Sequence, residues 1–139
     1  MENKFLSRIR SFIDFKIGFA GGLVMGVIVF IINYRATYDI TGATTAALKQ
    51  GVYTFFFGGI IMKMCEQLAT RINPRFLAIL LAVVIPSFIS LALTLGLHSL
   101  KGTPKPLEST IPTAVFVIPS TLVWGILKRR KKGLKASND

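Results

Sequence analysis

The sequence predicts an all-α integral membrane protein: a compact bundle of four transmembrane helices, preceded by a short basic amphipathic helix at the membrane interface. Of the 139 residues, 52% are hydrophobic and only 17% are charged. The apolar residues form four helix-length runs without alternation, and 13 of the 17 Lys and Arg residues fall on one side of these runs. Because only helices and closed barrels satisfy every backbone polar group in hydrocarbon, the runs predict spanning helices.

The N-terminal segment 3–16 is expected to form the interfacial helix. Apolar side chains such as Phe5 and Phe12 recur on one helical face, whereas Arg8 and Arg10 lie on the other. A helix of this kind lies in the headgroup plane, where Arg8 and Arg10 contact anionic lipids. The alternative, a simple extension of the first span into water, would expose both phenylalanines.

Four spans follow, and the connections between them are too short to hold a soluble domain. A stretch of about 20 apolar residues crosses the hydrocarbon. We therefore expect a single membrane domain that ends in a basic cytosolic tail, residues 128–139. The predicted spans are residues 17–34, 45–65, 76–97 and 111–127.

The distribution of basic residues predicts the orientation, because Lys and Arg near span ends are retained in the cytosol. Four precede the first span, three lie around the second connection and six follow the fourth span. An even number of spans places both termini together, so we expect a multi-pass protein with cytosolic termini, in the plasma membrane or in the inner membrane of a Gram-negative bacterium. The tail residues expected to contact anionic lipid headgroups are Lys128, Arg129, Arg130, Lys131 and Lys132.

Small residues recur at helical spacing in the first two spans. Such residues let two helix backbones approach closely in a membrane. The pattern predicts that these two spans pack on each other, and packing between copies in a homo-oligomer is the alternative that the sequence leaves open. The residues expected at this contact are Gly18, Gly22, Gly26, Gly51, Thr54 and Gly58.

Prolines interrupt the third and fourth spans at Pro86 and Pro119, and each removes one backbone donor. Nearby hydroxyl groups can bond the freed carbonyls, so structural kinks are the first interpretation. The second is a polar pathway or ligand cavity between the kinked spans. The residues that would line it are Ser87, Ser90, Thr94, His98, Thr113 and Ser120.

No catalytic, cofactor or metal motif of recognised spacing occurs. His98 is the single histidine and has no companion ligands in the pattern of a zinc site. The basic residues are divided among membrane-adjacent segments without a nucleic-acid-binding motif, so neither a cofactor nor nucleic acid is expected.

The favoured function is therefore a small non-catalytic membrane protein that packs with itself or with a larger membrane complex. An oligomeric channel or transporter, lined by the third and fourth spans, is the alternative. The least favoured class is a lipid-modifying enzyme that uses His98, Lys101 and Glu108 of the external loop.

Overall fold

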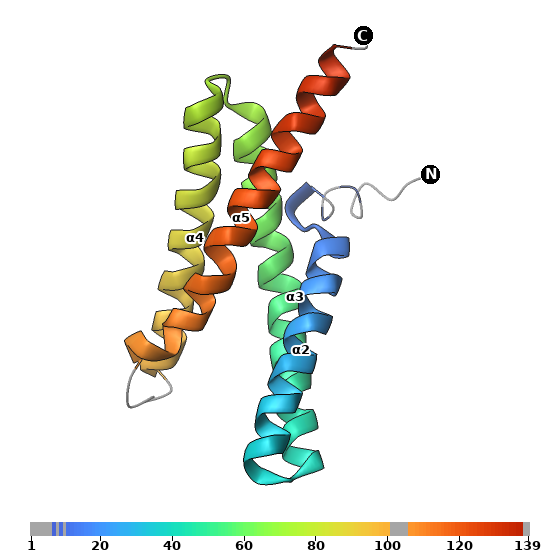
Figure 1. Cartoon of the computed structure of the whole chain (residues 1–139), viewed down its shortest axis with the longest axis vertical. Coiled ribbons are helices and arrows are strands. Elements are labelled where there is room, and N and C mark those ends of the chain that lie inside the picture. Colours follow the sequence, from blue (N-terminus) through green and yellow to red (C-terminus); the bar gives the residue numbers. More distant parts are fainter. Residues whose placement is uncertain (1–6, 8, 10, 101–105, 138–139) are drawn as a thin grey trace. The chain divides into compact units, whose positions relative to one another are not determined.

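The computed structural model describes residues 7, 9, 11–100 and 106–137, which form long helices joined by short connections. The helices follow one another as α2 (Phe15–Thr37), α3 (Ile40–Arg71), α4 (Arg75–Leu100) and α5 (Pro106–Ala136), labelled as in Figure 1. The chain divides into two compact units, Met1–Lys63 and Met64–Asp139, here called the first and second units. The single membrane domain stays a prediction.

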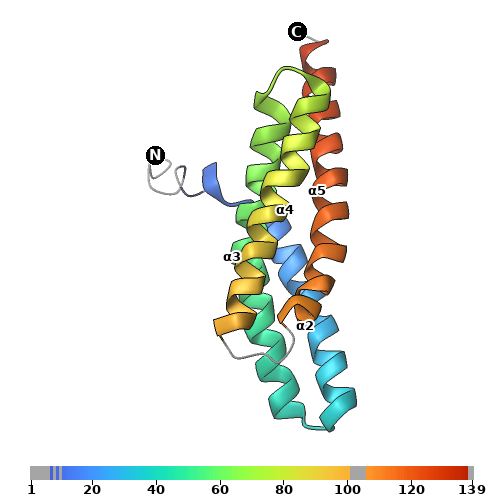
Figure 2. The ribbon, with the colours of Figure 1, turned by 90° about the vertical axis from the view of Figure 1, so that its left-hand side faces the viewer.

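The first unit is a helical hairpin of α2 and the first part of α3 (Figure 2). The Asp14 carboxylate caps the start of α2 by accepting a hydrogen bond from the Ile17 N–H at 3.2 Å. α2 ends at Thr37, and the next residue, Tyr38, caps it in a left-handed conformation with a φ of 55°. The Asp39 carboxylate then accepts hydrogen bonds of 2.9 and 3.0 Å from two N–H groups in the first turn of α3. An aspartate thus caps the start of each helix of the hairpin, and Asp39 does so at the turn between them.

The second unit contains α4, α5 and the last turns of α3. α4 and α5 pack against each other. A small core of Cys65, Ala69 and Ala82 is fully buried, and Leu68 and Trp124 pack against it. Small side chains at these positions allow the end of α3 to approach the α4–α5 pair closely.

The prolines of the second unit lie inside helices that continue past them. α4 contains Pro86, and α5 contains Pro112 and Pro119. Pro106 is the first residue of α5, a position whose N–H has no partner within a helix in any case.

Three of the four helices in the described part of the chain are long and apolar enough to cross a membrane, namely Phe15–Thr37, Arg75–Leu97 and the part of α5 from Thr110 to Ala136. This composition is that of a multi-pass membrane protein. The 32 residues of α3 reach about 48 Å at about 1.5 Å per residue. However, Lys49 and Lys63 interrupt its apolar stretch, which makes it the most polar of the predicted spans. The prediction of four spanning helices is thus supported for three of them.

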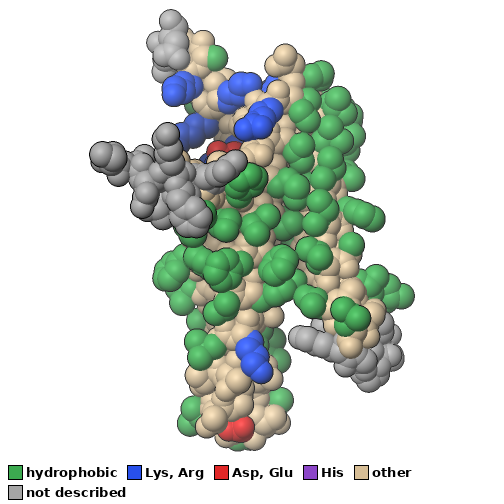
Figure 3. Space-filling model, turned by 180° about the vertical axis from the view of Figure 1, so that it is seen from behind, with side chains coloured by type: hydrophobic (Ala, Val, Ile, Leu, Met, Phe, Trp, Pro, Cys, Tyr) green, Lys and Arg blue, Asp and Glu red, His purple; other side chains and the backbone are tan. Residues whose placement is uncertain are grey.

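Large hydrophobic side chains are exposed along the helices, as the green surface in Figure 3 illustrates. Phe19 of α2 is 66% exposed and Phe88 of α4 is 71% exposed. Surfaces this apolar are unfavourable in water, whereas lipid tails accept them. The exposure therefore agrees with the length and composition of the three apolar helices.

Each predicted span lies inside one helix, and each helix extends beyond it. α5 continues through most of the predicted tail as far as Ala136. The predicted interfacial helix, residues 3–16, falls largely outside the described residues. Within it, Ser11 and Phe12 are helical, and the helix is interrupted at Ile13 and Asp14 before α2 begins.

Candidate functional site

α2 and α3 meet backbone to backbone in the first unit. A Cβ atom placed on Gly22 would lie 2.7 Å from the carbonyl oxygen of Gly51, and a Cβ on Gly51 would lie 3.2 Å from the carbonyl oxygen of Gly22. A Cβ on Gly18 would collide with the carbonyl oxygen of Phe55. Because backbone atoms cannot move aside as flexible side chains do, these positions accept glycine and little else.

The contact recurs at every fourth residue of both helices. On α2 it continues to Gly26, where a Cβ would lie 3.4 Å from the carbonyl oxygen of Ala47. On α3 it continues to Gly59, whose carbonyl oxygen accepts a hydrogen bond from the Asp14 N–H at 3.1 Å. A Cβ on Gly59 would lie only 2.8 Å from Cγ2 of Ile13. The glycine seam is defined here as Gly18, Gly22, Gly26, Gly51 and Gly59.

Thr54 and Gly58 lie beside the glycine seam rather than in it. The Thr54 methyl group would meet a Cβ on Gly21 at 3.5 Å, an ordinary contact, and the Thr54 hydroxyl accepts a hydrogen bond from Gln50 at 3.2 Å. A Cβ on Gly58 would meet the Thr54 methyl group of its own helix at 3.5 Å. The structure therefore brings four of the six predicted packing residues to the contact and places Gly59 where Gly58 was expected.

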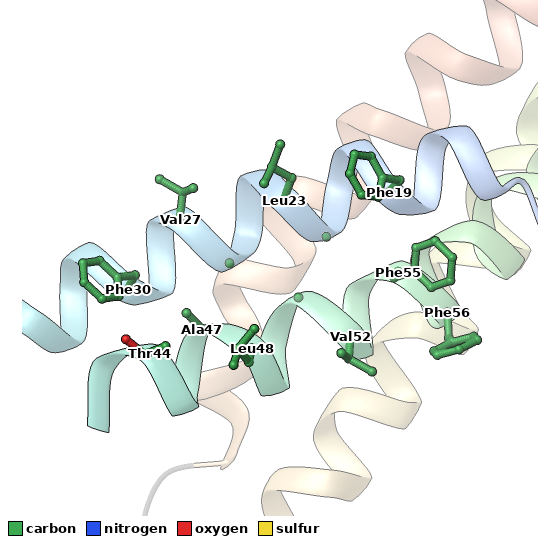
Figure 4. Close-up of a pocket in the computed structure, with 13 residues that line it drawn as sticks. Phe19, Leu23, Val27, Phe30, Thr44, Ala47, Leu48, Val52, Phe55 and Phe56 are labelled. Atoms are coloured by element: carbon green, nitrogen blue, oxygen red, sulfur yellow. The ribbon is translucent and has the colours of Figure 1, made fainter. Parts of the chain in front are cut away.

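An open groove of about 590 Å³ runs along one flank of the glycine seam. Figure 4 shows Leu23 and Val27 of α2 on one side of the line where the helices meet, and Leu48 and Val52 of α3 on the other. Thr44 contributes the single side-chain hydroxyl among the lining residues. The groove is therefore suited to an apolar occupant.

A buried cluster of hydroxyl and thiol groups joins three helices of the second unit. The hydroxyl groups of Ser87 on α4 and Thr121 on α5 lie 3.2 Å apart and share a hydrogen bond. The Cys65 thiol at the end of α3 donates to the carbonyl oxygen of Thr121 at 3.2 Å. The Thr121 hydroxyl also lies 2.9 Å from the carbonyl oxygen of Val117, one turn earlier. The hydroxyl cluster is defined here as Cys65, Ser87 and Thr121. It joins the three helices close to Pro86 of α4 and Pro119 of α5.

The remaining residues of the predicted pathway do not gather around this cluster. The Thr94 hydroxyl donates to the carbonyl oxygen of Ser90 on its own helix at 2.8 Å. Thr113 is half-buried and Ser120 is exposed. The side chain of His98 lies outside the described residues. The structure thus brings Ser87 together with Thr121, a residue that the predicted pathway did not include.

The basic run after the fourth span covers the carboxyl end of α3. The Arg129 guanidinium donates to the carbonyl oxygens of Ala69 at 3.0 Å and Asn73 at 2.5 Å, and also to that of Ile72. The Lys132 ammonium donates to the carbonyl oxygen of Thr70 at 2.6 Å. The last carbonyls of a helix have no partner within it and carry partial negative charge, so these cations cap α3.

Lys128 forms a partly exposed ion pair with Glu66 of α3 at 3.0 Å. Its ammonium also lies 4.5 Å from the centre of the Trp124 ring, a cation–π contact. Of the five tail residues expected at lipid headgroups, three therefore contact α3 or Trp124, while Arg130 and Lys131 are exposed. Arg8 and Arg10 lie outside the described residues.

The sequence interpretation missed Gly59, and it left Thr121 out of the predicted pathway. The four-residue period Ala47, Gly51, Phe55, Gly59 was present. Phe55 concealed it because the closest approach to α2 is made by its backbone carbonyl oxygen, which residue type does not reveal. Thr121 carried a signal as well, since it follows Pro119 by two residues.

Among the described residues, no group of three or more His, Cys, Asp and Glu side chains could hold a metal ion. Comparison with family models, with curated proteins and with solved structures finds no match to this chain.

Proposed function

We propose that this protein is a non-catalytic, four-span membrane protein that acts by helix packing, with itself or with a larger membrane complex. The hydroxyl cluster carries the proposal. Polar side chains that could have lined a pathway, Ser87 and Thr121, are buried against each other, and the Cys65 thiol joins them. Buried groups paired in this way hold helices together, and they are not available to solvate a passing ion.

α3 is proposed as the fourth crossing. It is long enough to pass through about 30 Å of hydrocarbon with residues to spare. It also packs antiparallel to α2 along the glycine seam, and α2 is apolar enough to span. Lys49 and Lys63, which make α3 more polar, stand 14 positions apart near the two ends of the predicted span, where their side chains can reach the interfaces.

Both termini are proposed to lie in the cytosol of a plasma or bacterial inner membrane, because the basic residues favour that side. Exposed Arg130 and Lys131 then face anionic lipid headgroups, at about 1 kcal/mol for each basic residue. The capping cations Arg129 and Lys132 join the start of the tail to the end of α3.

The exposed apolar side chains are the surfaces proposed for packing with other membrane helices. Phe88 of α4 is 71% exposed and Val115 of α5 is 62% exposed. Lipid tails cover such surfaces as readily as protein does, so association would depend on close packing rather than on burial from water.

Two measurements test the proposal. In liposomes, the purified protein should pass no ions or small solutes above the level of protein-free liposomes. In intact membranes, chemical cross-linking should recover the protein in adducts larger than one chain. Flux that scales with the amount of protein would overturn the proposal, and so would a protein that stays monomeric under all cross-linking conditions.

A channel or transporter assembled from several copies is the second candidate. Ser120 favours it, because this hydroxyl is exposed beside Pro119 on an otherwise apolar surface of α5. If liposomes show flux, Ser120→Ala should reduce it when α5 lines the pathway. The lipid-modifying enzyme is proposed last, since its loop residues Lys101 and His98 contribute no described side chain.

A further inference from the structure

The groove beside the glycine seam is apolar, open and long enough for a helix to lie in it. Its wall on α2 extends from Phe19 to Phe30, and its wall on α3 extends from Thr44 to Phe56. These lengths are about 16 and 18 Å at about 1.5 Å per residue, or about three helical turns. Val52 on the α3 wall is 58% exposed, so the groove is open to the surroundings.

A lysine stands at the rim of this groove on α3. Lys49 is exposed, follows Leu48 directly and precedes Val52 by three residues. Leu48 and Val52 both belong to the α3 wall, as Figure 4 shows. Residues three apart are neighbours on a helix surface. The Lys49 side chain is therefore placed beside the space that an occupant of the groove would fill.

Lys49 lies within the predicted hydrocarbon on two counts. It stands four residues inside the predicted span 45–65. The glycine seam also sets Gly51 level with Gly22. Because the two helices are antiparallel, Lys49 lies level with Val24, seven residues inside the first predicted span. These offsets are about 6 and 10 Å along a helix, a depth at which a cation calls for a partner or a path to water.

The described acidic residues of the first unit are distant from Lys49 along the helices. Asp39 precedes it by ten residues on α3, about 15 Å, and its carboxylate bonds the first turn of that helix. Asp14 lies beside Gly59, ten residues beyond Lys49 in the other direction. No acidic residue of the chain falls within a predicted span, so a second copy would bring none to Lys49 inside the hydrocarbon.

We propose that the groove receives one transmembrane helix of a different membrane protein, and that an Asp or Glu side chain of this helix pairs with Lys49. The inference rests on the proposed function and names a partner within the larger complex. Opposite charges attract strongly where water is excluded, and the apolar walls fit the rest of the helix. A lipid phosphate lies at the headgroup level, whereas a helix can place its carboxylate at the depth of Lys49.

Synthetic transmembrane peptides serve as probes for the partner helix. One is a Leu–Ala helix with a single Asp at the depth of Lys49, and the other has Asn at that position. The full chain carries a dye on a cysteine introduced at Ala36, exposed near the end of α2, in a Cys65→Ser background. Energy transfer to a dye on the peptide measures binding in liposomes of phosphatidylcholine and phosphatidylglycerol, where anionic lipid competes for Lys49.

We expect the Asp peptide to bind at least about tenfold more tightly than the Asn peptide, the lower end of the range for close charge pairs. Lys49→Gln should remove this difference, and Lys49→Arg should keep it. Lys16→Gln, the same loss of charge at an exposed position of α2 outside the groove, should leave it unchanged.

A second pair of variants tests the apolar walls. Val52→Trp fills the groove with a bulky ring and should block both peptides. Val24→Trp lies outside the groove and is exposed to nearly the same degree, 55% against 58%, so it should bind as the unsubstituted chain does. If Val52→Trp fails to fold, the substitutions at exposed Lys49 still decide the question.

Equal or undetectable binding of the Asp and Asn peptides would overturn the proposed helix site. So would a preference for Asp that survives in Lys49→Gln. A dimer of the chain alone that Val52→Trp dissociates would make the groove a contact between copies and leave the packing function intact. Failure of the packing function appears instead as protein-dependent flux, a separate measurement.

Discussion

Replacing Gly22 by alanine should weaken the contact between α2 and α3. The new Cβ would lie 2.7 Å from the carbonyl oxygen of Gly51, whereas ordinary contacts begin at 3.4 Å. The helices would therefore have to separate by about 0.7 Å at this point, and separations of about 0.5–1 Å already forfeit a quarter to a half of each van der Waals contact. The neighbouring contact at Gly18 would open with it.

The expected free-energy change follows from two opposing effects. Inserting a methyl group into a close-packed contact costs about 1–3 kcal/mol. Alanine is a better helix former than glycine by up to about 1 kcal/mol. We therefore expect Gly22→Ala to lower the free energy of unfolding by about 1–2 kcal/mol.

Gly21→Ala is the matched control, because it makes the same substitution one residue away. Its Cβ would lie 3.5 Å from the Thr54 methyl group, an ordinary contact. The helix-propensity gain remains while the overlap is absent, so Gly21→Ala should be neutral or slightly stabilising.

Titration with SDS in mixed micelles measures the free energy of unfolding of this hairpin. Energy transfer between dyes on cysteines introduced at Phe12 and Met62 reports the separation of α2 and α3, in a Cys65→Ser background that all variants share. Equal stability of Gly22→Ala and Gly21→Ala would refute the backbone contact at the glycine seam.

Three further substitutions test the remaining contacts. Thr121→Val should lower the free energy of unfolding by about 1 kcal/mol, because it leaves the buried Ser87 hydroxyl without its partner; SDS titration measures the loss. Arg129→Gln should speed hydrogen exchange in the last turn of α3, because it uncaps the carbonyl oxygens there; mass spectrometry of the peptides reports the rate. Asp14→Ala should lower the free energy of unfolding by about 1 kcal/mol through loss of the helix cap, again in the SDS titration.

Each of these predictions has its own control. Thr113→Val makes the same change at a half-buried threonine outside the hydroxyl cluster, and a loss equal to that of Thr121→Val would argue against the cluster. Arg130→Gln removes an exposed charge beside the cap, and faster exchange in both variants would indicate a general charge effect. Asp14→Asn keeps a capping side chain, so it should retain most of the stability that Asp14→Ala loses.

Much of the fold follows from the sequence because hydrocarbon imposes one strong constraint. A chain that must pair every backbone group internally becomes helical, so apolar runs predict helices directly. The ends of the helices were not predictable in this way. α5 continues to Ala136 because the cations on its last turns bind the end of α3, an interaction between segments about 60 residues apart.

The candidate site was predictable where spacing alone decides it. The repeat of Gly18, Gly22 and Gly26 marked the face of α2, because glycine has no side chain to place elsewhere. On α3, backbone atoms of Phe55 make the contact, and residue type does not reveal that. The pairing of Ser87 with Thr121 likewise depends on how α4 and α5 pack.

Whether α3 crosses the membrane is the question on which the proposed function most depends. Reporter proteins that distinguish the cytosol from the exterior can be fused to the two termini of the full chain. They show whether the chain crosses the membrane an even or an odd number of times. Four spans predict that both termini report the cytosol, as the basic residues beside the apolar runs require. Termini on opposite sides would show an odd number of crossings, as expected if only the three most apolar helices span. That result would contradict the proposal of four membrane-spanning helices.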